Sequence, residues 1–328
     1  MENKKVIAFA GCKDTTLECI TALLEEGHQI DLLITIDEAN AEKNKVAGYM
    51  NLQDFAKKNN IEVYICKSYS LTSEEDKEAL AKKNIDLLLV IGWQRLIPEW
   101  LLLRLSIGSF GMHGSPRPLP YGRGRSPMNW SLIQGKDKFI TNLFKYNPGV
   151  DDGDILATEI FDINQYDTAQ TCHYKNTLSM IKILKVNMDR MLRNDFKLRP
   201  QLDIPATFFP KRTEKDGVIF WDKDTTEIYN LIRGVTFPFP GAFTFLGDEK
   251  IRIWKAQPFD TRLFNADIQA GTILNVFHNG DFIVKTGSDS LLITVYETNN
   301  KEIIKKGKIL SSKDYEYKSP FSLPSINP

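Results

Sequence analysis

Apolar runs alternate with helical repeats along the first third of the chain. The runs have the composition of buried parallel strands and occupy residues 6–10, 30–36, 61–65 and 86–91. Apolar side chains at helical spacing predict helices at residues 14–24, 52–56, 73–83 and 98–103. Because strands and helices alternate, we predict an α/β fold with a doubly wound, Rossmann-like parallel sheet.

The pattern becomes irregular after residue 107. Residues 108–127 contain five glycines, four prolines and four basic or histidine side chains. This composition predicts an irregular loop, and long loops inside compact domains are usually functional. Regular structure is predicted again at residues 129–134 and 139–146, and a helix at residues 168–193 closes the first domain.

The last third of the chain has the pattern of a small β domain. Prolines punctuate the connection at Pro200, Pro205 and Pro210, and a helix is predicted at residues 225–233. Short strands are predicted at residues 242–246, 251–254, 271–277, 282–285 and 291–296. We therefore expect two domains, residues 1–203 and residues 204–328, the second of them a small β-barrel.

Charge and composition narrow the classes of function. Lys and Arg number 42, as do Asp and Glu, so the formal net charge is zero, which weakens the case for a dedicated nucleic-acid binder. No apolar run approaches the about 20 residues that span a membrane, and the first residues lack the layout of a signal peptide. The four cysteines are scattered, so neither a metal site nor a disulfide framework is expected. We predict a cytoplasmic protein.

Candidate chemistry concentrates on one histidine and one acidic turn. The first strand–helix turn has a single glycine, Gly11, where a GxGxxG dinucleotide fingerprint needs three, which disfavours an NAD enzyme. His113 has glycines on both sides that would let a substrate approach closely, and residues 149–154 form an acidic cluster. A histidine bonded to backbone and a solvated acidic turn are the structural alternatives. At neighbouring strand ends, the two segments could form an acid–base site.

Several motifs resemble those of the folate-dependent formyltransferases, which include methionyl-tRNA formyltransferase and the sugar-nucleotide N-formyltransferases. The family elements H-G-S, R-G-R-x-P and G-x-D-x-G-D-I-L have counterparts at residues 113–115, 123–127 and 149–156. Segment 92–98 is similar to the family's folate-pocket loop, and segments 208–213, 216–219 and 238–243 are similar to its C-terminal part. The resemblance covers nearly the whole chain and implies a catalytic first domain followed by an OB-like β domain.

The resemblance implies transfer of a formyl group from the co-substrate N10-formyltetrahydrofolate to a primary amine. It assigns to Asp151 either proton handling or the holding of the catalytic histidine and a water, and it assigns stabilisation of the developing oxyanion to His113. The folate is expected to contact Arg95, Leu96, Ile97, Asn147, Pro148 and Asp151. The acceptor is expected to contact Gly114, Ser115, Arg123, Arg125 and Asn129. The two arginines suit a diphosphate, and anchoring of the loop through backbone carbonyls is their alternative role.

One position departs from the family pattern. The family motif N-x-H carries an asparagine whose amide donates to the oxyanion, and here that position is Gly111. Losing one oxyanion donor typically costs about 100- to 1000-fold in rate. Either another group takes its place, such as Asn129 or a backbone N–H, or the protein is a catalytically weakened folate- or nucleotide-binding homologue.

The preferred acceptor is a nucleotide-linked 4-amino sugar. Residues 128–130 and 237–241 are similar to segments of UDP-4-amino-4-deoxy-arabinose formyltransferase. Methionyl-tRNA is the alternative acceptor. It is less favoured because a chain with no net charge lacks the overall electrostatic field that attracts phosphates. The lysines of residues 301–308 form either a basic patch or a solvated face. Phe237 and Phe239 either stack a base or pack the small domain. The oligomeric state is left open, a homodimer included.

Overall fold

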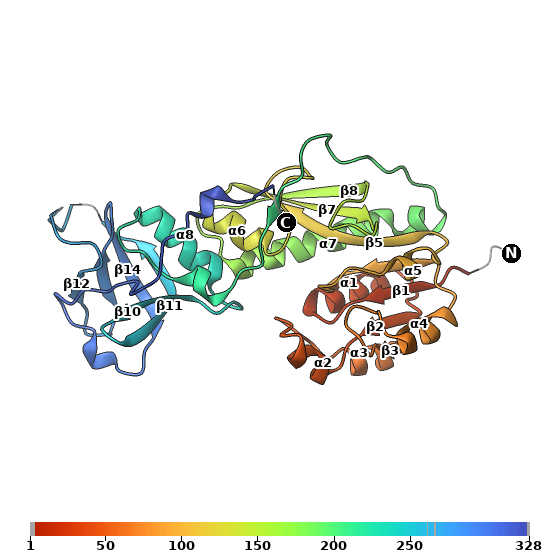
Figure 1. Cartoon of the computed structure of the whole chain (residues 1–328), viewed down its shortest axis with the longest axis horizontal. Coiled ribbons are helices and arrows are strands. Elements are labelled where there is room, and N and C mark those ends of the chain that lie inside the picture. Colours follow the sequence, from red (N-terminus) through yellow and green to blue (C-terminus); the bar gives the residue numbers. More distant parts are fainter. Residues whose placement is uncertain (1–3, 261, 266, 327–328) are drawn as a thin grey trace. The chain divides into compact units, whose positions relative to one another are not determined.

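The computed structural model describes residues 4–260, 262–265 and 267–326. The chain forms two compact units (Figure 1). The first contains the residues up to Arg123, Ile140–Phe161 and Lys175–Ala206, and the second contains Gly124–Phe139, Asp162–Tyr174 and the chain from Thr207 onwards. Two internal segments therefore belong with the C-terminal unit by packing, and a division into domains at residue 203 stays a prediction.

A seven-stranded sheet organises the first unit. Its strands are β1 (Ile7–Ala10), β2 (Leu32–Thr35), β3 (Glu62–Ile65), β4 (Leu87–Val90), β5 (Gly108–Ser115), β7 (Lys138–Lys145) and β8 (Ile155–Asp162). Their order across the sheet is β3-β2-β1-β4-β5-β7-β8. The first five are mutually parallel, and β7 runs antiparallel to β5. The predicted Rossmann-like sheet is confirmed.

Helices cover both faces of this sheet. They are α1 (Asp14–Glu25), α2 (Glu38–Lys43), α3 (Gln53–Lys58), α4 (Glu74–Ala81), α5 (Glu99–Leu102) and α7 (Ala169–Leu192). Successive strand residues point to opposite sides, so Phe9 and Leu89 pack with α1, α3 and α7, whereas Ala10 and Val90 pack with α2, α4 and α5. Strands β1, β2 and β4 are therefore buried on both faces, which explains why their sequences are continuously apolar.

The second unit is built on a five-stranded antiparallel sheet. Its strands are β10 (Ala242–Leu246), β11 (Glu249–Pro258), β12 (Ile273–Val276), β13 (Phe282–Lys285) and β14 (Ser290–Glu297), in the order β10-β11-β14-β13-β12. Two helices, α6 (Pro127–Ile133) and α8 (Thr225–Val235), pack closely because Gly234 has no side chain: a Cβ there would lie 3.0 Å from Ile133. A short ribbon pairs β6 (Arg123–Gly124) with β9 (Phe208–Phe209). The predicted C-terminal β domain is confirmed.

One prediction of local structure is wrong. Residues 108–115 form the strand β5 instead of the first part of a loop. The glycine-rich segment stays extended because β4 and β7 pair with its backbone on both sides. The strand β8 and the helix α2 were not expected from the pattern. Among the described residues, no helix combines the length and apolar character needed to cross a membrane.

Candidate active site

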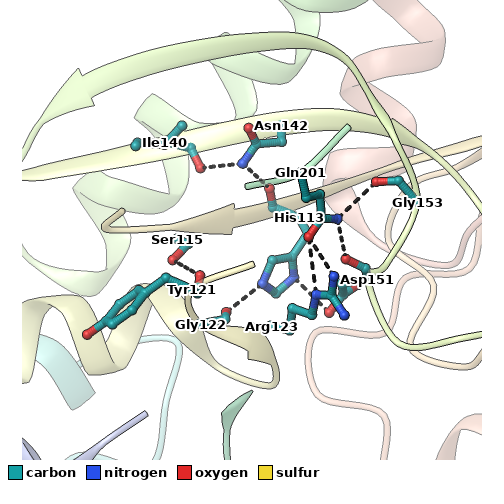
Figure 2. A network of polar contacts seen from close by, with 10 residues as sticks. All are labelled: His113, Ser115, Tyr121, Gly122, Arg123, Ile140, Asn142, Asp151, Gly153 and Gln201. Atoms are coloured by element: carbon teal, nitrogen blue, oxygen red, sulfur yellow. Dashed lines mark hydrogen bonds and ion pairs between the residues drawn. The ribbon is translucent and has the colours of Figure 1, made fainter. Parts of the chain in front are cut away.

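His113 lies in β5, the strand at which the sheet changes from parallel to antiparallel pairing. β4 ends at Val90, which is opposite Gly111, so His113 lies two residues beyond the carboxyl end of its parallel neighbour. Ligands of open α/β sheets bind at this edge. The His113 side chain is 8 % exposed, and its Nε2 donates to the Gly122 carbonyl oxygen at 2.8 Å (Figure 2).

Asp151 faces the other nitrogen of the imidazole. Its Oδ2 lies 3.3 Å from His113 Nδ1, so the structure brings together the two segments that the sequence analysis paired. Asp151 has a φ of 48°, a left-handed conformation in which aspartate is enriched. The Gly122 carbonyl and an ionised Asp151 are both acceptors, so the close pair requires a second proton, on Nδ1 or on the carboxyl. The pair can therefore hold or release a proton beside a reacting group.

Gln201 ties the acidic turn to Arg123, and no sequence motif singles it out. Its Nε2 donates to the carbonyl oxygens of Asp151 at 2.7 Å and of Gly153 at 2.9 Å (Figure 2). Its Oε1 accepts from Arg123 Nη2 at 2.7 Å and from Nε at 3.2 Å. Because Gln201 lies in the proline-punctuated connection, outside every motif, only the three-dimensional contacts identify it.

Three of the predicted acceptor-binding residues lie in the first unit. Gly114 and Ser115 end β5, and the buried Ser115 hydroxyl donates to the Tyr121 carbonyl at 2.6 Å. This bond closes the turn that follows the strand, which is a structural role. The Arg123 guanidinium is partly exposed, and two of its nitrogens donate to Gln201 Oε1. Because this acceptor is a neutral amide, the contact orients the guanidinium and leaves its positive charge. Acceptor binding by these residues stays a prediction.

The other two lie in the second unit. The backbone N–H of Arg125 donates to the Phe209 carbonyl at 2.9 Å. Asn129 is buried in α6, and its Nδ2 donates to the Gly234 carbonyl at 2.8 Å. That amide therefore has a partner in the packing of α6 on α8, which favours a structural role for Asn129. Acceptor binding by Arg125 and Asn129 also stays a prediction.

The predicted folate residues begin at the carboxyl end of β4. Arg95 Nη2 donates to Asn44 Oδ1 at 3.2 Å, and its guanidinium lies 4.8 Å from the centre of the Tyr69 ring. Leu96 is exposed, whereas the next residue, Ile97, is buried in the core. The oriented guanidinium of Arg95 and the exposed side chain of Leu96 together suit a ligand ring that has an apolar face and polar edges. The residues Asn147 and Pro148, which follow β7, are exposed.

Tyr146 fills the space beside Gly111. A Cβ atom at Gly111 would lie 2.5 Å from Cε1, Cζ and the hydroxyl oxygen of Tyr146, closer than real Cβ atoms approach other atoms. The tyrosine ring stacks on Phe144 with 5.1 Å between centroids. Burial raises the pKa of the Tyr146 hydroxyl, and the negative charge of Asp151 raises it further. Glycine at position 111 is thus required by the position of this ring.

The four cysteines do not form a cluster at this site. All four are buried thiols, and burial raises the pKa of Cys12 in particular. In the described part of the chain, no group of three or more His, Cys, Asp or Glu side chains is placed to hold a metal ion. A catalytic role for His113 and Asp151 stays a prediction.

Comparisons with known proteins decide the family. Residues 4–180 match the model described as formyl transferase, and residues 211–314 match formyl transferase, C-terminal domain. The chain belongs to the formyl transferase family. This family member is 32 % identical over 272 residues to the bifunctional polymyxin resistance protein ArnA of Wigglesworthia glossinidia brevipalpis. That match covers 83 % of this chain and 40 % of ArnA, so the chain spans less than half the length of that relative.

Solved structures share the fold of this formyl transferase family member. The N-formyltransferase from Helicobacter canadensis, in complex with folinic acid and dTDP-3-aminofucose, has a TM-score of 0.66 at 18 % identity over 90 % of this chain and 100 % of that one. WlaRD, a sugar 3N-formyl transferase in the presence of dTDP and 5-N-formyl-THF, has a TM-score of 0.63 at 20 % identity over 90 % of this chain and 98 % of that one.

Proposed function

We propose that this protein transfers the formyl group of N10-formyltetrahydrofolate to the primary amine of a nucleotide-linked amino sugar. The observation that carries the proposal is the contact of His113 Nδ1 with Asp151 Oδ2 at 3.3 Å, at the ligand-binding edge of the sheet in a formyl transferase family member. The proposed role of the pair is to move the protons that formyl transfer requires.

The proposed reaction has two proton movements. The acceptor amine attacks the formyl carbon, a carbon–nitrogen bond forms, and the carbonyl oxygen becomes an oxyanion. When the carbonyl re-forms, the bond from the formyl carbon to N10 of the folate breaks. The amine loses one proton and N10 gains one, so a pair that holds one exchangeable proton, Asp151 and His113, can take the first and supply the second.

The acceptor class is supported by two kinds of observation. The Helicobacter canadensis N-formyltransferase has a similar fold and holds a thymidine-linked aminosugar together with folinic acid, and WlaRD was solved with dTDP and 5-N-formyl-THF. In this chain, Arg123 is a partly exposed guanidinium oriented by Gln201, and forks of this kind match diphosphate oxygens. The balance of 42 positive and 42 negative side chains offers no overall field for tRNA.

Mass spectrometry of candidate acceptors tests the proposal. UDP-, GDP- and dTDP-linked amino sugars and charged initiator methionyl-tRNA are incubated separately with the protein and N10-formyltetrahydrofolate. We expect one sugar nucleotide to gain a formyl group, and a matched reaction with Asp151→Asn to form far less of it. Formylation of the tRNA alone would overturn the acceptor class, and no product from any acceptor would overturn the proposed function.

A further inference from the structure

The hydroxyl of Tyr146 lies at the distance from residue 111 that the missing amide would have. In asparagine, the amide nitrogen lies two bonds from Cβ, which places it about 2.4 Å away. The Tyr146 hydroxyl oxygen lies 2.5 Å from the Cβ position of Gly111. A hydrogen-bond donor is therefore present beside position 111, although the residue there has no side chain.

This hydroxyl lies on the face of the sheet that carries His113. Residues two apart in a strand point to the same face, so Gly111 and His113 share one. Phe144 is opposite Gly111 in the antiparallel pair, and the Tyr146 N–H donates to the Ser109 carbonyl, which continues the pairing beyond β7. The phenol beside Gly111 and the imidazole of His113 therefore border the same face of β5.

The Tyr146 hydroxyl is also a donor with no partner among the described residues. It is partly exposed, and its hydroxyl makes no hydrogen bond with any of the residues 4–260, 262–265 and 267–326. Stacking on Phe144 holds the ring in place. Because burial and then the charge of Asp151 raise the pKa of the phenol, it keeps its proton at neutral pH.

The other candidate donors are already engaged. Asn129 Nδ2 donates to the Gly234 carbonyl, and the backbone of β5 pairs with β4 and β7. His113 Nε2 donates to the Gly122 carbonyl, and its Nδ1 faces Asp151. Of these donors, the phenol hydroxyl is the one with no partner among the described residues.

We infer that the Tyr146 hydroxyl donates a hydrogen bond to the formyl oxygen during transfer, in place of the amide that the family motif puts at position 111. The inference rests on the proposed function. Tyr146 keeps its proton throughout, so the hydrogen bond changes no step of the proton balance. It strengthens as the carbonyl oxygen becomes an oxyanion, which lowers the barrier to attack by the amine.

Tyr146→Phe is the first test, because it removes the donor and keeps the ring that fills the space beside Gly111. We expect kcat to fall about 100- to 1000-fold, with little change in the dissociation constant of N10-formyltetrahydrofolate. Tyr64→Phe in β3 is the matched control, since it removes a phenol hydroxyl bonded to Asp76 at 2.8 Å and should keep kcat. An unchanged kcat in Tyr146→Phe would overturn the inference.

Restoring the family arrangement is the second test. Gly111→Asn alone places its Cβ against the tyrosine ring and should be poorly active. In a Tyr146→Ala background that space is open, so Gly111→Asn should raise kcat at least about 10-fold above Tyr146→Ala alone. Full activity of Gly111→Asn alone, or a soluble and folded double variant no faster than Tyr146→Ala, would overturn the inference.

An infrared measurement separates this inference from the proposed function because it needs no turnover. N10-[13C]formyltetrahydrofolate is bound to the wild-type protein and to Tyr146→Phe, and the labelled carbonyl stretch is compared. A hydrogen bond lowers that frequency, so the substitution should raise it. An unmoved band overturns the role of Tyr146 even in a protein that formylates a sugar nucleotide. A raised band in a protein that formylates no acceptor supports that role and overturns the proposed function alone.

Discussion

The two ends of the candidate site use their polar groups in opposite ways. At one end, both imidazole nitrogens of His113 are engaged, by Gly122 and by Asp151, and Gln201 holds the acidic turn. At the other end, Tyr146 packs closely against Gly111, and its hydroxyl has no partner within the described part of the chain. We propose that the first end holds a proton and that the second donates a hydrogen bond to a ligand. Gly111 lacks the asparagine amide of the family motif, and the Tyr146 side chain occupies the space beside it.

The largest effect is expected at the proton-holding end. His113→Ala should lower kcat about 1000-fold or more, because it removes the group that shares a proton with Asp151. The dissociation constant of N10-formyltetrahydrofolate should change little, as measured by equilibrium titration. His278→Ala, at an exposed position of the second unit, serves as the histidine control. Equal losses of turnover and folate affinity in His113→Ala would contradict a role in proton transfer.

A double-mutant cycle tests the packed end. Gly111→Ala adds a Cβ 2.5 Å from the phenol, so it should displace the hydroxyl and lower kcat about 100-fold. The same substitution in Tyr146→Phe should cost little further activity, since the donor is already absent. Steady-state kinetics of the four proteins measure the coupling. Additive losses would show that Gly111 and Tyr146 act independently.

A smaller effect is expected from the connection between the acidic turn and Arg123. Gln201→Ala should lower kcat about 10-fold, because Asp151 loses the hydrogen bond that positions its turn. Gln201→Glu keeps an acceptor for Arg123 and loses the donor to the two carbonyls, so it should resemble the alanine variant. A Gln201→Glu protein with wild-type kcat and pH profile would show that only the contact with Arg123 matters.

The smallest effect on turnover is expected at Asp76, which belongs to neither end. Burial acts to raise the pKa of Asp76, but hydrogen bonds from Ser73, Lys67 and Ser68 outweigh it, so the pKa is lowered. Its stabilising contribution is therefore present above the ordinary pKa of about 3.9 and is lost as pH falls through the lowered value. Asp76→Asn should keep kcat at pH 7 and lower the free energy of unfolding by about 1–3 kcal/mol.

Urea unfolding of Asp76→Asn and wild type at pH 7 and pH 3 measures that contribution. The difference between the two proteins should shrink at the lower pH. A difference that grows on acidification would contradict the sign of the pKa change. A loss of kcat at pH 7 would show that Asp76, in α4, affects the site.

The fold is predictable from the sequence where a strand is buried on both faces, because burial requires a continuous run of apolar residues. Strands β1, β2 and β4 are buried on both faces, so their apolar runs predict them directly. The prediction for β5 is wrong because its glycines are typical of a loop. The segment stays extended because it pairs with β4 and β7, and the local sequence does not show this pairing. Register and neighbours, not composition, decide the structure of this segment.

The site is predictable where a side chain itself carries the chemistry. His113 and Asp151 are found from their motifs, and the structure brings them within 3.3 Å. Gln201 contacts backbone carbonyls, and Tyr146 occupies the space beside Gly111, so neither has a sequence signature. Asn129 has the right functional group, but it is used in helix packing.

A crystal structure of the protein with N10-formyltetrahydrofolate tests the account most directly. We expect the formyl group to lie between His113 and Tyr146, with its oxygen about 2.7 Å from the Tyr146 hydroxyl. The formyl carbon would then be accessible to an amine beside the Asp151 carboxyl. A formyl group bound away from His113 and Asp151, or a phenol turned away from its oxygen, would contradict the account.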